Sequence, residues 1–312
     1  AGFTDDAFLV LRSKHKAQAR VQIPFEQIGG QVQIVCETGL PAVPLLIPIL
    51  NLTVLSKGAL PLHASAFDYN GIGVVVTGWS KGGKTETLLA FMANGAEYIG
   101  DEWVYISGDG QRMCGIPEPI RVWDWHLQDL PQYRAQVGWD DRVRLRALKL
   151  MVRSTERMIS NDVGHQSAPV RLMSRMTPLL KRQLCVDLPP EELFGQGLGI
   201  LMGTPDKVFF AASHEASDTT VLPIDPQEIA RRMVFSLEEE RLPLMSFYLK
   251  FRFAFPEARN ELIERAEELQ RERLTQVLAD KEAYAIYHPY PPSIPALFDA
   301  LSPLVLEEEQ GR

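Results

Sequence analysis

The pattern of apolar and polar positions changes character along the 312-residue chain. Residues 7–56 carry short alternating runs rich in β-branched side chains, with glycine and proline between them. Period-two alternation bounded by turn residues is typical of β-strands, so we expect strands at 7–11, 19–23 and 32–36. A helix is expected at 45–56. Residues 1–57 are therefore predicted to form a small β-rich N-terminal part.

Residues 58–225 combine strand and helix patterns. Apolar runs at 60–67 and 74–76 flank Asn70-Gly71, the pair that a two-residue hairpin turn favours. These runs predict a β-hairpin. Runs between 197 and 223 return to strand character, and we expect them to close the far edge of the same sheet.

Helix signals dominate the last part of the chain. Asp225-Pro226-Gln227-Glu228 is a capping box with proline at the first helical position, and the helix is expected to end near residue 240. The apolar run at 243–255 is a candidate for a separate helix, and a charged helix at 257–278 and a short helix at 295–306 should follow. Residues 226–312 are thus predicted to be mainly helical, and the whole chain is predicted to be an α/β protein.

A glycine-rich loop joins the apolar run at 74–76 to a predicted helix at 85–94. It matches the phosphate-binding pattern G-x-x-x-x-G-K-[ST] and reads Gly78-Trp79-Ser80-Lys81-Gly82-Gly83-Lys84-Thr85. Glycines let successive N–H groups converge on phosphate oxygens, and the helix N-terminus adds positive partial charge. Lys84 supplies a full charge for the β- and γ-phosphates, and the Thr85 hydroxyl is suited to bind Mg²⁺. A glycine-rich turn with an incidental lysine is the alternative, which the agreement of strand, loop and helix disfavours.

An acidic pair, Asp101-Glu102, follows the short apolar run at 96–99. Acidic pairs on protein surfaces are commonly just solvated. A phosphate-transfer site, however, needs a carboxylate near the γ-phosphate, either to bind Mg²⁺ or to accept a proton. We therefore interpret both residues as candidate site residues.

Three segments together resemble the catalytic core of HPr kinase/phosphorylase, whose fold is related to that of phosphoenolpyruvate carboxykinase. They are Leu62-His63-Ala64-Ser65, the loop followed by Glu86, and Gly95-Ala96 with Asp101-Glu102. The resemblance covers about residues 58–122. Glu102 stands where the family carries a second aspartate.

The resemblance implies a kinase that uses ATP and Mg²⁺. It assigns nucleotide binding to residues 78–86, Mg²⁺ binding to Thr85, Glu102 and Asp101, and catalysis to Asp101, His63 and Lys84. Asp101 would be the base on an acceptor hydroxyl, with His63 nearby to orient or polarise. Arg121 is a further candidate for holding charge on the acceptor or on the γ-phosphate.

A basic segment at 142–184 lies within a predicted insert near 141–185. Its cations are Arg142, Arg144, Arg146, Lys149, Arg153, Arg157, Arg171, Arg175, Lys181 and Arg182, and its acids are Glu156 and Asp162. Its apolar positions follow rough helical spacing. We interpret it as amphipathic helices with a solvated basic face. A docking face for an acidic partner or a nucleic acid is the alternative.

Three tryptophans, Trp123, Trp125 and Trp139, lie within residues 122–140. Exposed aromatic side chains could contact a substrate, but tryptophan is more often buried. We expect these three side chains to be buried.

Composition narrows the classes of function. A net charge of −8 argues against a surface that binds nucleic acid as a whole. Cys36, Cys114 and Cys185 are odd in number and far apart, which disfavours a disulfide framework or a zinc cluster and favours the reducing cytoplasm. The most apolar stretch, 40–55, is interrupted by prolines and is shorter than a membrane span, so no membrane partner is expected.

These observations favour ATP-dependent phosphoryl transfer to a hydroxyl acceptor. The acceptor is left open between a small molecule and a protein, and so is association into a homo-oligomer or with a partner protein. One alternative is a nucleotide-dependent switch with little transferase activity, because long extra helices suit partner contacts. The other is a nucleic-acid-linked ATPase that uses the 142–182 face.

Overall fold

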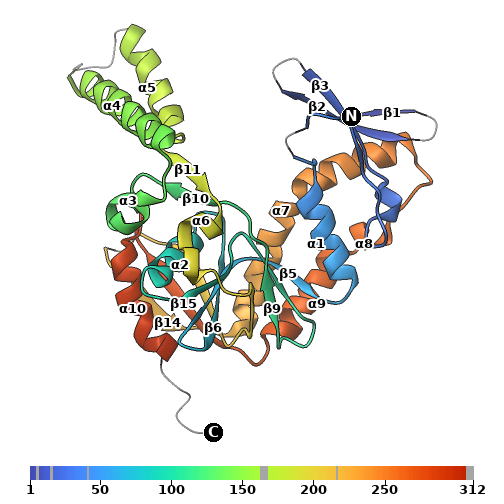
Figure 1. Cartoon of the computed structure of the whole chain (residues 1–312). Coiled ribbons are helices and arrows are strands. Elements are labelled where there is room, and N and C mark those ends of the chain that lie inside the picture. The colour runs from blue at the N-terminus through green and yellow to red at the C-terminus, as the bar shows by residue number, and fades with distance from the viewer. Residues whose placement is uncertain (5–6, 15–16, 41, 162–167, 216, 307–312) are drawn as a thin grey trace.

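The computed structural model describes residues 1–4, 7–14, 17–40, 42–161, 168–215 and 217–306. Over these residues the chain is a mixed α/β protein with one large mixed sheet and a mainly helical C-terminal half (Figure 1). The prediction of an α/β fold with a helical C-terminal half is confirmed. None of the described helices is long and apolar enough to cross a membrane.

The large sheet forms the centre of the molecule. Its strands are β5 Leu60–Tyr69, β6 Ile72–Gly78, β7 Glu97–Gly100, β8 Trp103–Ile106, β9 Met113–Gly115, β12 Met202–Gly203, β13 Lys207–Ser213, β14 Thr220–Pro223 and β15 Glu282–His288. Their order is β12-β9-β8-β5-β6-β13-β15-β14, and β7 also pairs with β5. Strands β6, β13 and β15 run parallel to one another. Their carboxyl ends therefore meet at one edge of the sheet, where the glycine-rich loop begins.

The β5–β6 hairpin forms at the turn that the sequence predicts. Asn70 and Gly71 have φ angles of 56° and 83°, which a type I′ turn requires at both central positions. The Gly71 N–H donates to Asp68 Oδ1 at 2.8 Å. The register pairs Ala64 with Thr77, so His63 lies opposite the end of β6.

The prediction that residues 197–223 close the far edge of the sheet is wrong for β13. This strand lies in the middle of the sheet, between β6 and β15, whereas β12 and β14 from the same stretch lie at its two opposite edges. Its first five residues, from Lys207 to Ala211, are all buried. A run that is buried on both faces is typical of a central parallel strand rather than an edge strand.

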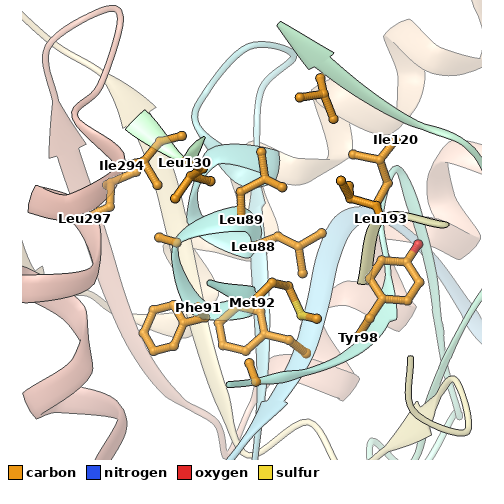
Figure 2. Close-up of a cluster of buried hydrophobic side chains, with 14 of the residues drawn as sticks. Leu88, Leu89, Phe91, Met92, Tyr98, Ile120, Leu130, Leu193, Ile294 and Leu297 are labelled. Carbon is orange, nitrogen blue, oxygen red and sulfur yellow. The ribbon is translucent and has the colours of Figure 1, made fainter. Parts of the chain in front are cut away.

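Helix α2 (Lys84–Met92) follows the loop and is enclosed by apolar side chains. Figure 2 shows those around it, from β7, β10, α6, the turn after α3 and α10 (Ile294–Leu306): Tyr98, Ile120, Leu193, Leu130, Ile294 and Leu297. Phe91 stacks on Phe67 of β5, with 4.6 Å between the ring centroids. This burial fixes the first turn of α2 relative to the sheet.

The opposite face of the sheet is covered by α7 (Pro226–Ala254) and α9 (Ala266–Leu278). Asp225 caps the start of α7 by accepting a hydrogen bond from the Gln227 N–H, as the capping box predicts. Strand β15 follows α9 and joins the large sheet, so the C-terminal segment contributes to the core as well as covering it.

Helix α7 does not end near residue 240, and that prediction is wrong. Its buried positions continue through Leu244, Tyr248 and Phe251. Pro243 is exposed within the helix. Burying three large side chains, at about 1.5–3 kcal/mol each, outweighs the roughly 3 kcal/mol that an interior proline costs.

The N-terminal part packs on the second half of α7. It contains a separate sheet of β1 (Gly2–Phe3), β2 (Phe8–Lys14), β3 (Ala17–Gln22) and β4 (Val35–Cys36), followed by α1 (Leu46–Ser56). Phe25 is buried against Phe251 of α7, with ring centroids 5.4 Å apart. Asn260, which caps α8 (Glu261–Glu264), donates to the carbonyl oxygens of Phe25 and Ile28 at 2.8 and 2.9 Å.

The basic insert forms a helical hairpin that projects from the body (Figure 1). Its helices are α4 (Trp139–Asn161) and α5 (Ala168–Lys181), and a ribbon of β10 (Ile120–Trp123) and β11 (Cys185–Leu188) connects them to the core. Arg144 fastens the hairpin to the ribbon by donating to Gln183 O and Cys185 O at 3.2 and 2.8 Å. Asp162 lies outside the described residues.

The remaining short helices are α3 His126–Asp129, α6 Pro190–Phe194 and the 3₁₀ turns Phe25–Gln27, Pro131–Ala135 and Gly195–Gly197.

Candidate functional site

The loop between β6 and α2 is held against the carboxyl edge of the sheet. Ser213 at the end of β13 donates to Lys81 O at 3.3 Å, and His288 Nε2 at the end of β15 lies 2.7 Å from Gly82 O. Gly83 has a φ of 100°, and a Cβ there would lie 2.3 Å from His288 Nε2. Glycine is therefore required at this position both by the backbone conformation and by the close approach of the imidazole.

Lys84 is the first residue of α2, and its side chain is buried beneath the loop. Its Nζ donates to Trp79 O at 3.0 Å and to Gly78 O at 3.3 Å. Burial lowers the pKa of Lys84, and the negative charges of Glu102 and Asp101 act in the opposite direction. The amine is thus held inside the curve of the loop by neutral carbonyl acceptors.

Asp101 is buried next to the start of α2. The Thr85 hydroxyl donates to its Oδ2 at 3.0 Å, and the Ser65 hydroxyl of β5 donates to its Oδ1 at 2.5 Å. Burial, together with the charge of Glu102, raises the pKa of Asp101 to about 6 from its ordinary 3.8, against the effect of the two hydroxyl donors. The site therefore holds a carboxylate that is oriented on both oxygens and is more basic than usual.

Glu102 points toward the histidine of β5. His63 Nε2 lies 3.2 Å from Glu102 Oε2, and this hydrogen bond is the main reason that the pKa of Glu102 is lowered. His63 Nδ1 faces Glu240 Oε1 of α7 at 3.4 Å, an ion-pair distance without hydrogen-bond alignment. Glu102 has a φ of 65°, a left-handed conformation that is rare for this residue type. The two acids of the pair therefore have different surroundings and different ionisation behaviour.

Glu86 and His126 form a second pair beside the loop. The Trp123 N–H donates to His126 Nδ1 at 3.2 Å, so the opposite nitrogen, Nε2, carries the proton toward Glu86 Oε1, also at 3.2 Å. Burial raises the pKa of Glu86, but the hydrogen bond from His126 and its electrostatic attraction outweigh burial, and the net direction is downward. Glu86 is thus an ionised carboxylate held in place by a buried histidine.

A cavity of about 950 Å³ opens over these groups. Its loop side is formed by His63, Ser80, Lys81, Gly83, Lys84, Thr85, Glu86 and Glu102. Its far side is formed by Glu118, Pro119, Arg121, Trp123, Asp124, Trp125, His126, Lys181, Arg182, Leu184, Asp187, Tyr290 and Pro291. The volume is within the range of small-molecule sites.

The cavity brings together most of the residues that the sequence singles out. Gly78, Trp79 and Gly82 shape the loop without lining the cavity, and Asp101 lies beneath it, hydrogen-bonded to Thr85. Arg121 lines the cavity, but its guanidinium already binds Asp187 through Nε at 2.8 Å and Nη2 at 3.1 Å. Its charge is therefore largely compensated.

The prediction that the three tryptophans are buried is wrong for Trp139. This side chain is 71% exposed at the start of the projecting helix α4, where no described element covers it. Trp123 and Trp125 are half-buried and present part of their surface to the cavity.

Four side chains of the site carry no usable signal in the sequence: His126, Glu240, His288 and, outside the family resemblance, Ser65. Each comes from a separate element and reaches the site only through the fold. A histidine in an aromatic segment or at the end of an apolar strand is more often a packed residue than a ligand-binding one.

Within the described part of the chain, no group of three or more His, Cys, Asp or Glu side chains is placed to hold a metal ion by itself. No protein-family model and no curated protein matches this sequence.

Proposed function

We propose that this protein transfers the γ-phosphoryl group of ATP to an acceptor hydroxyl, using a phosphate-binding core of the HPr kinase type. The observation that carries the proposal is the contact between Thr85, at the start of α2, and the buried carboxylate of Asp101. It joins a hydroxyl suited to Mg²⁺, a basic carboxylate and a glycine-rich loop with a lysine. Phosphoryl transfer requires these groups within one site.

The chemistry of the loop fits a chain of phosphates. The first N–H groups of a helix have no partner within it, and here they belong to residues that line the cavity, at the positive end of the α2 dipole. Lys84 would exchange the carbonyl oxygens of Gly78 and Trp79 for phosphate oxygens, because an anionic acceptor forms the stronger hydrogen bond. The close packing at Gly83 leaves the backbone, rather than a side chain, to contact the phosphates.

The donor set fits Mg²⁺ when the nucleotide supplies the remaining ligands. Mg²⁺ prefers oxygen and commonly takes only one or two carboxylates from the protein, with phosphate oxygens and water completing its shell. Thr85, Asp101 and Glu102 would hold the ion on the protein side. When bound, Mg²⁺ would neutralise negative charge on the transferred phosphoryl group.

Asp101 is suited to accept the proton of the acceptor hydroxyl as that oxygen attacks the γ-phosphorus. A pKa of about 6 leaves it mostly ionised at neutral pH, and it is a stronger base than an ordinary aspartate. Ser65 and Thr85 fix the direction of its oxygens. His63 would hold Glu102 in place through their hydrogen bond. The negative charge of Glu102 in turn helps to raise the pKa of Asp101.

A nucleotide-dependent switch is the second candidate, and the position of the α4–α5 hairpin favours it. Lys181 and Arg182 at the end of α5, with Leu184, line the same cavity as the loop. A nucleotide in the cavity would therefore contact the base of the projecting hairpin, and its binding would be sensed there. The basic face of the same hairpin is what favours the third candidate, a nucleic-acid-linked ATPase.

Transfer from γ-labelled ATP separates these functions. With Mg²⁺ present, a kinase labels an acceptor from a small-molecule pool or a cell extract, and Asp101→Asn loses most of the transfer while it still binds ATP. Asp109→Asn, which alters an exposed carboxylate in a hairpin turn, is the matched control and should keep the activity. ATP binding without transfer to any acceptor would favour the switch. Absence of ATP binding would refute the proposed core itself.

A further inference from the structure

Helix α7 presents an apolar stripe to solvent on the side away from the core. Phe235, Leu242, Leu249 and Phe253 are 59%, 56%, 66% and 82% exposed. At about 100° of rotation per residue they fall within an arc of about 40°. The first three are spaced by seven residues, which is the repeat of a helix–helix seam.

The stripe is additional to the face that α7 already buries. Met233, Leu237, Leu244 and Tyr248, on the opposite side of the helix, pack against the sheet and the N-terminal part. An amphipathic surface helix normally has one apolar face and one polar face. The stripe is about 27 Å long, at 1.5 Å per residue, and exposed Glu238, Glu239 and Ser246 lie between its apolar side chains. A row of four large exposed apolar side chains on one side of a helix is typical of an interaction site.

Charges beside the stripe indicate which partner fits it. Glu239 and Lys250 lie on the same flank, both are exposed, and neither forms an ion pair with a described residue. They are placed about equally far on either side of a point between residues 244 and 245. A two-fold axis through that point would bring Glu239 of each copy against Lys250 of the other, and Phe235 beside Phe253.

We propose that two copies of this chain associate through α7, with the two helices antiparallel and the stripes in contact. An isologous interface of this kind must be self-complementary. The antiparallel arrangement meets that requirement in two ways. Phe235 of each copy lies beside Phe253 of the other, and Glu239 of each copy faces Lys250 of the other. A single helix pair lies at the small end of protein interfaces, so the dimer should dissociate on dilution.

The oligomeric state tests the proposal. We expect sedimentation of the full chain between about 1 μM and 1 mM to show a monomer–dimer equilibrium. Leu242→Glu places a charge in the seam and should leave only monomer. The matched control is Leu150→Glu on α4, where the leucine is 64% exposed, and it should keep the dimer. Circular dichroism checks that both variants fold.

A charge exchange tests the orientation. At low ionic strength, Glu239→Lys and Lys250→Glu should each weaken the dimer at least several-fold, and the double variant E239K/K250E should restore it. A wild-type protein that stays monomeric over the whole range, or a dimer that Leu242→Glu leaves intact, would overturn the interface. Failure of the double variant to restore association would overturn the antiparallel arrangement. Capture of the monomer by anionic phospholipid vesicles, lost in Leu242→Glu, would assign the stripe to a lipid surface instead.

Discussion

Thr85 donates a hydrogen bond to Asp101, with Oγ1 3.0 Å from Oδ2. The contact joins the first turn of α2 to the residue that follows β7. Because Asp101 is buried, its ionisation depends on this donor, on Ser65 and on nearby charges rather than on water. Changes at either end of the contact should therefore have measurable effects on nucleotide chemistry and on stability.

Lys84→Ala should weaken ATP binding without unfolding the protein. The change removes the charged donor beneath the loop, and hydrogen bonds to charged groups are worth about 1.5–3 kcal/mol. Titration calorimetry with Mg²⁺ and ATP measures the effect. Lys57→Ala, an exposed lysine after α1, is the control. Unchanged ATP affinity in a folded Lys84→Ala protein would show that the loop does not bind phosphates.

Asp101→Asn should reduce turnover far more than it reduces ATP affinity. Asparagine keeps the shape but cannot accept the proton, and general-base catalysis is worth about 10²–10⁴ in rate. In the wild type, kcat/KM should fall as the pH drops through about 6, because Asp101 becomes protonated there. Steady-state kinetics across pH measures both effects. Equal turnover by the two proteins with an acceptor present would remove Asp101 from the role of base.

The same substitution should stabilise the fold above about pH 6. Asp101 has a raised pKa in the folded state, so the folded protein binds this proton more tightly than the unfolded chain does. The contribution of Asp101 to the free energy of unfolding is therefore most favourable at low pH. It falls between pH 3.8 and about 6 and stays reduced above that window. The shift corresponds to about 3 kcal/mol.

Urea unfolding of the wild type and Asp101→Asn at several pH values checks this expectation. The variant should be the more stable protein at neutral pH by up to about 3 kcal/mol, and the gap should close toward pH 4. A gap that does not change with pH would mean that the carboxylate is not strained by burial.

Gly83→Ala should destabilise the loop. A Cβ there would lie 2.3 Å from His288 Nε2, and the φ of 100° is unfavourable for alanine. We expect a loss of roughly 1–3 kcal/mol and weaker ATP binding. Gly95→Ala is the control, since its φ is 90° but nothing lies within 4 Å of the added Cβ. The double variant G83A/H288A should recover part of the difference, and no recovery would show that the His288 contact is unimportant.

Charge reversal on the hairpin should leave ATP turnover nearly unchanged. Arg153 and Arg157 are exposed on α4, whereas Arg144 fastens the hairpin to β11 and is not a suitable test position. R153E/R157E therefore probes the basic face alone. Salt-dependent binding of DNA or RNA, measured by fluorescence anisotropy, should be absent in both proteins. Tight binding that the double reversal abolishes would favour the nucleic-acid-linked ATPase.

Features that depend on a few neighbouring residues could be predicted from the sequence. Asn70-Gly71 specifies its turn because both residues tolerate positive φ, and Asp225 specifies a helix start because its side chain accepts a hydrogen bond from an N–H two residues later. The loop at 78–85 and the nearby acid Asp101 were likewise predictable as candidate site residues, since their chemistry is visible in their types and spacing.

Pairing between distant segments was decided only by the tertiary structure. Apolar content predicts that most of 207–213 is buried, but not that this strand pairs with β6 on one side and β15 on the other. That pairing carries His288 to Gly82, 206 residues away in the chain. The length of α7, and with it the place of Glu240 beside His63, likewise depends on what the helix packs against. The physical reason is that burial is non-directional: a sequence shows which side chains avoid water, whereas their partners are chosen by how all the elements pack together.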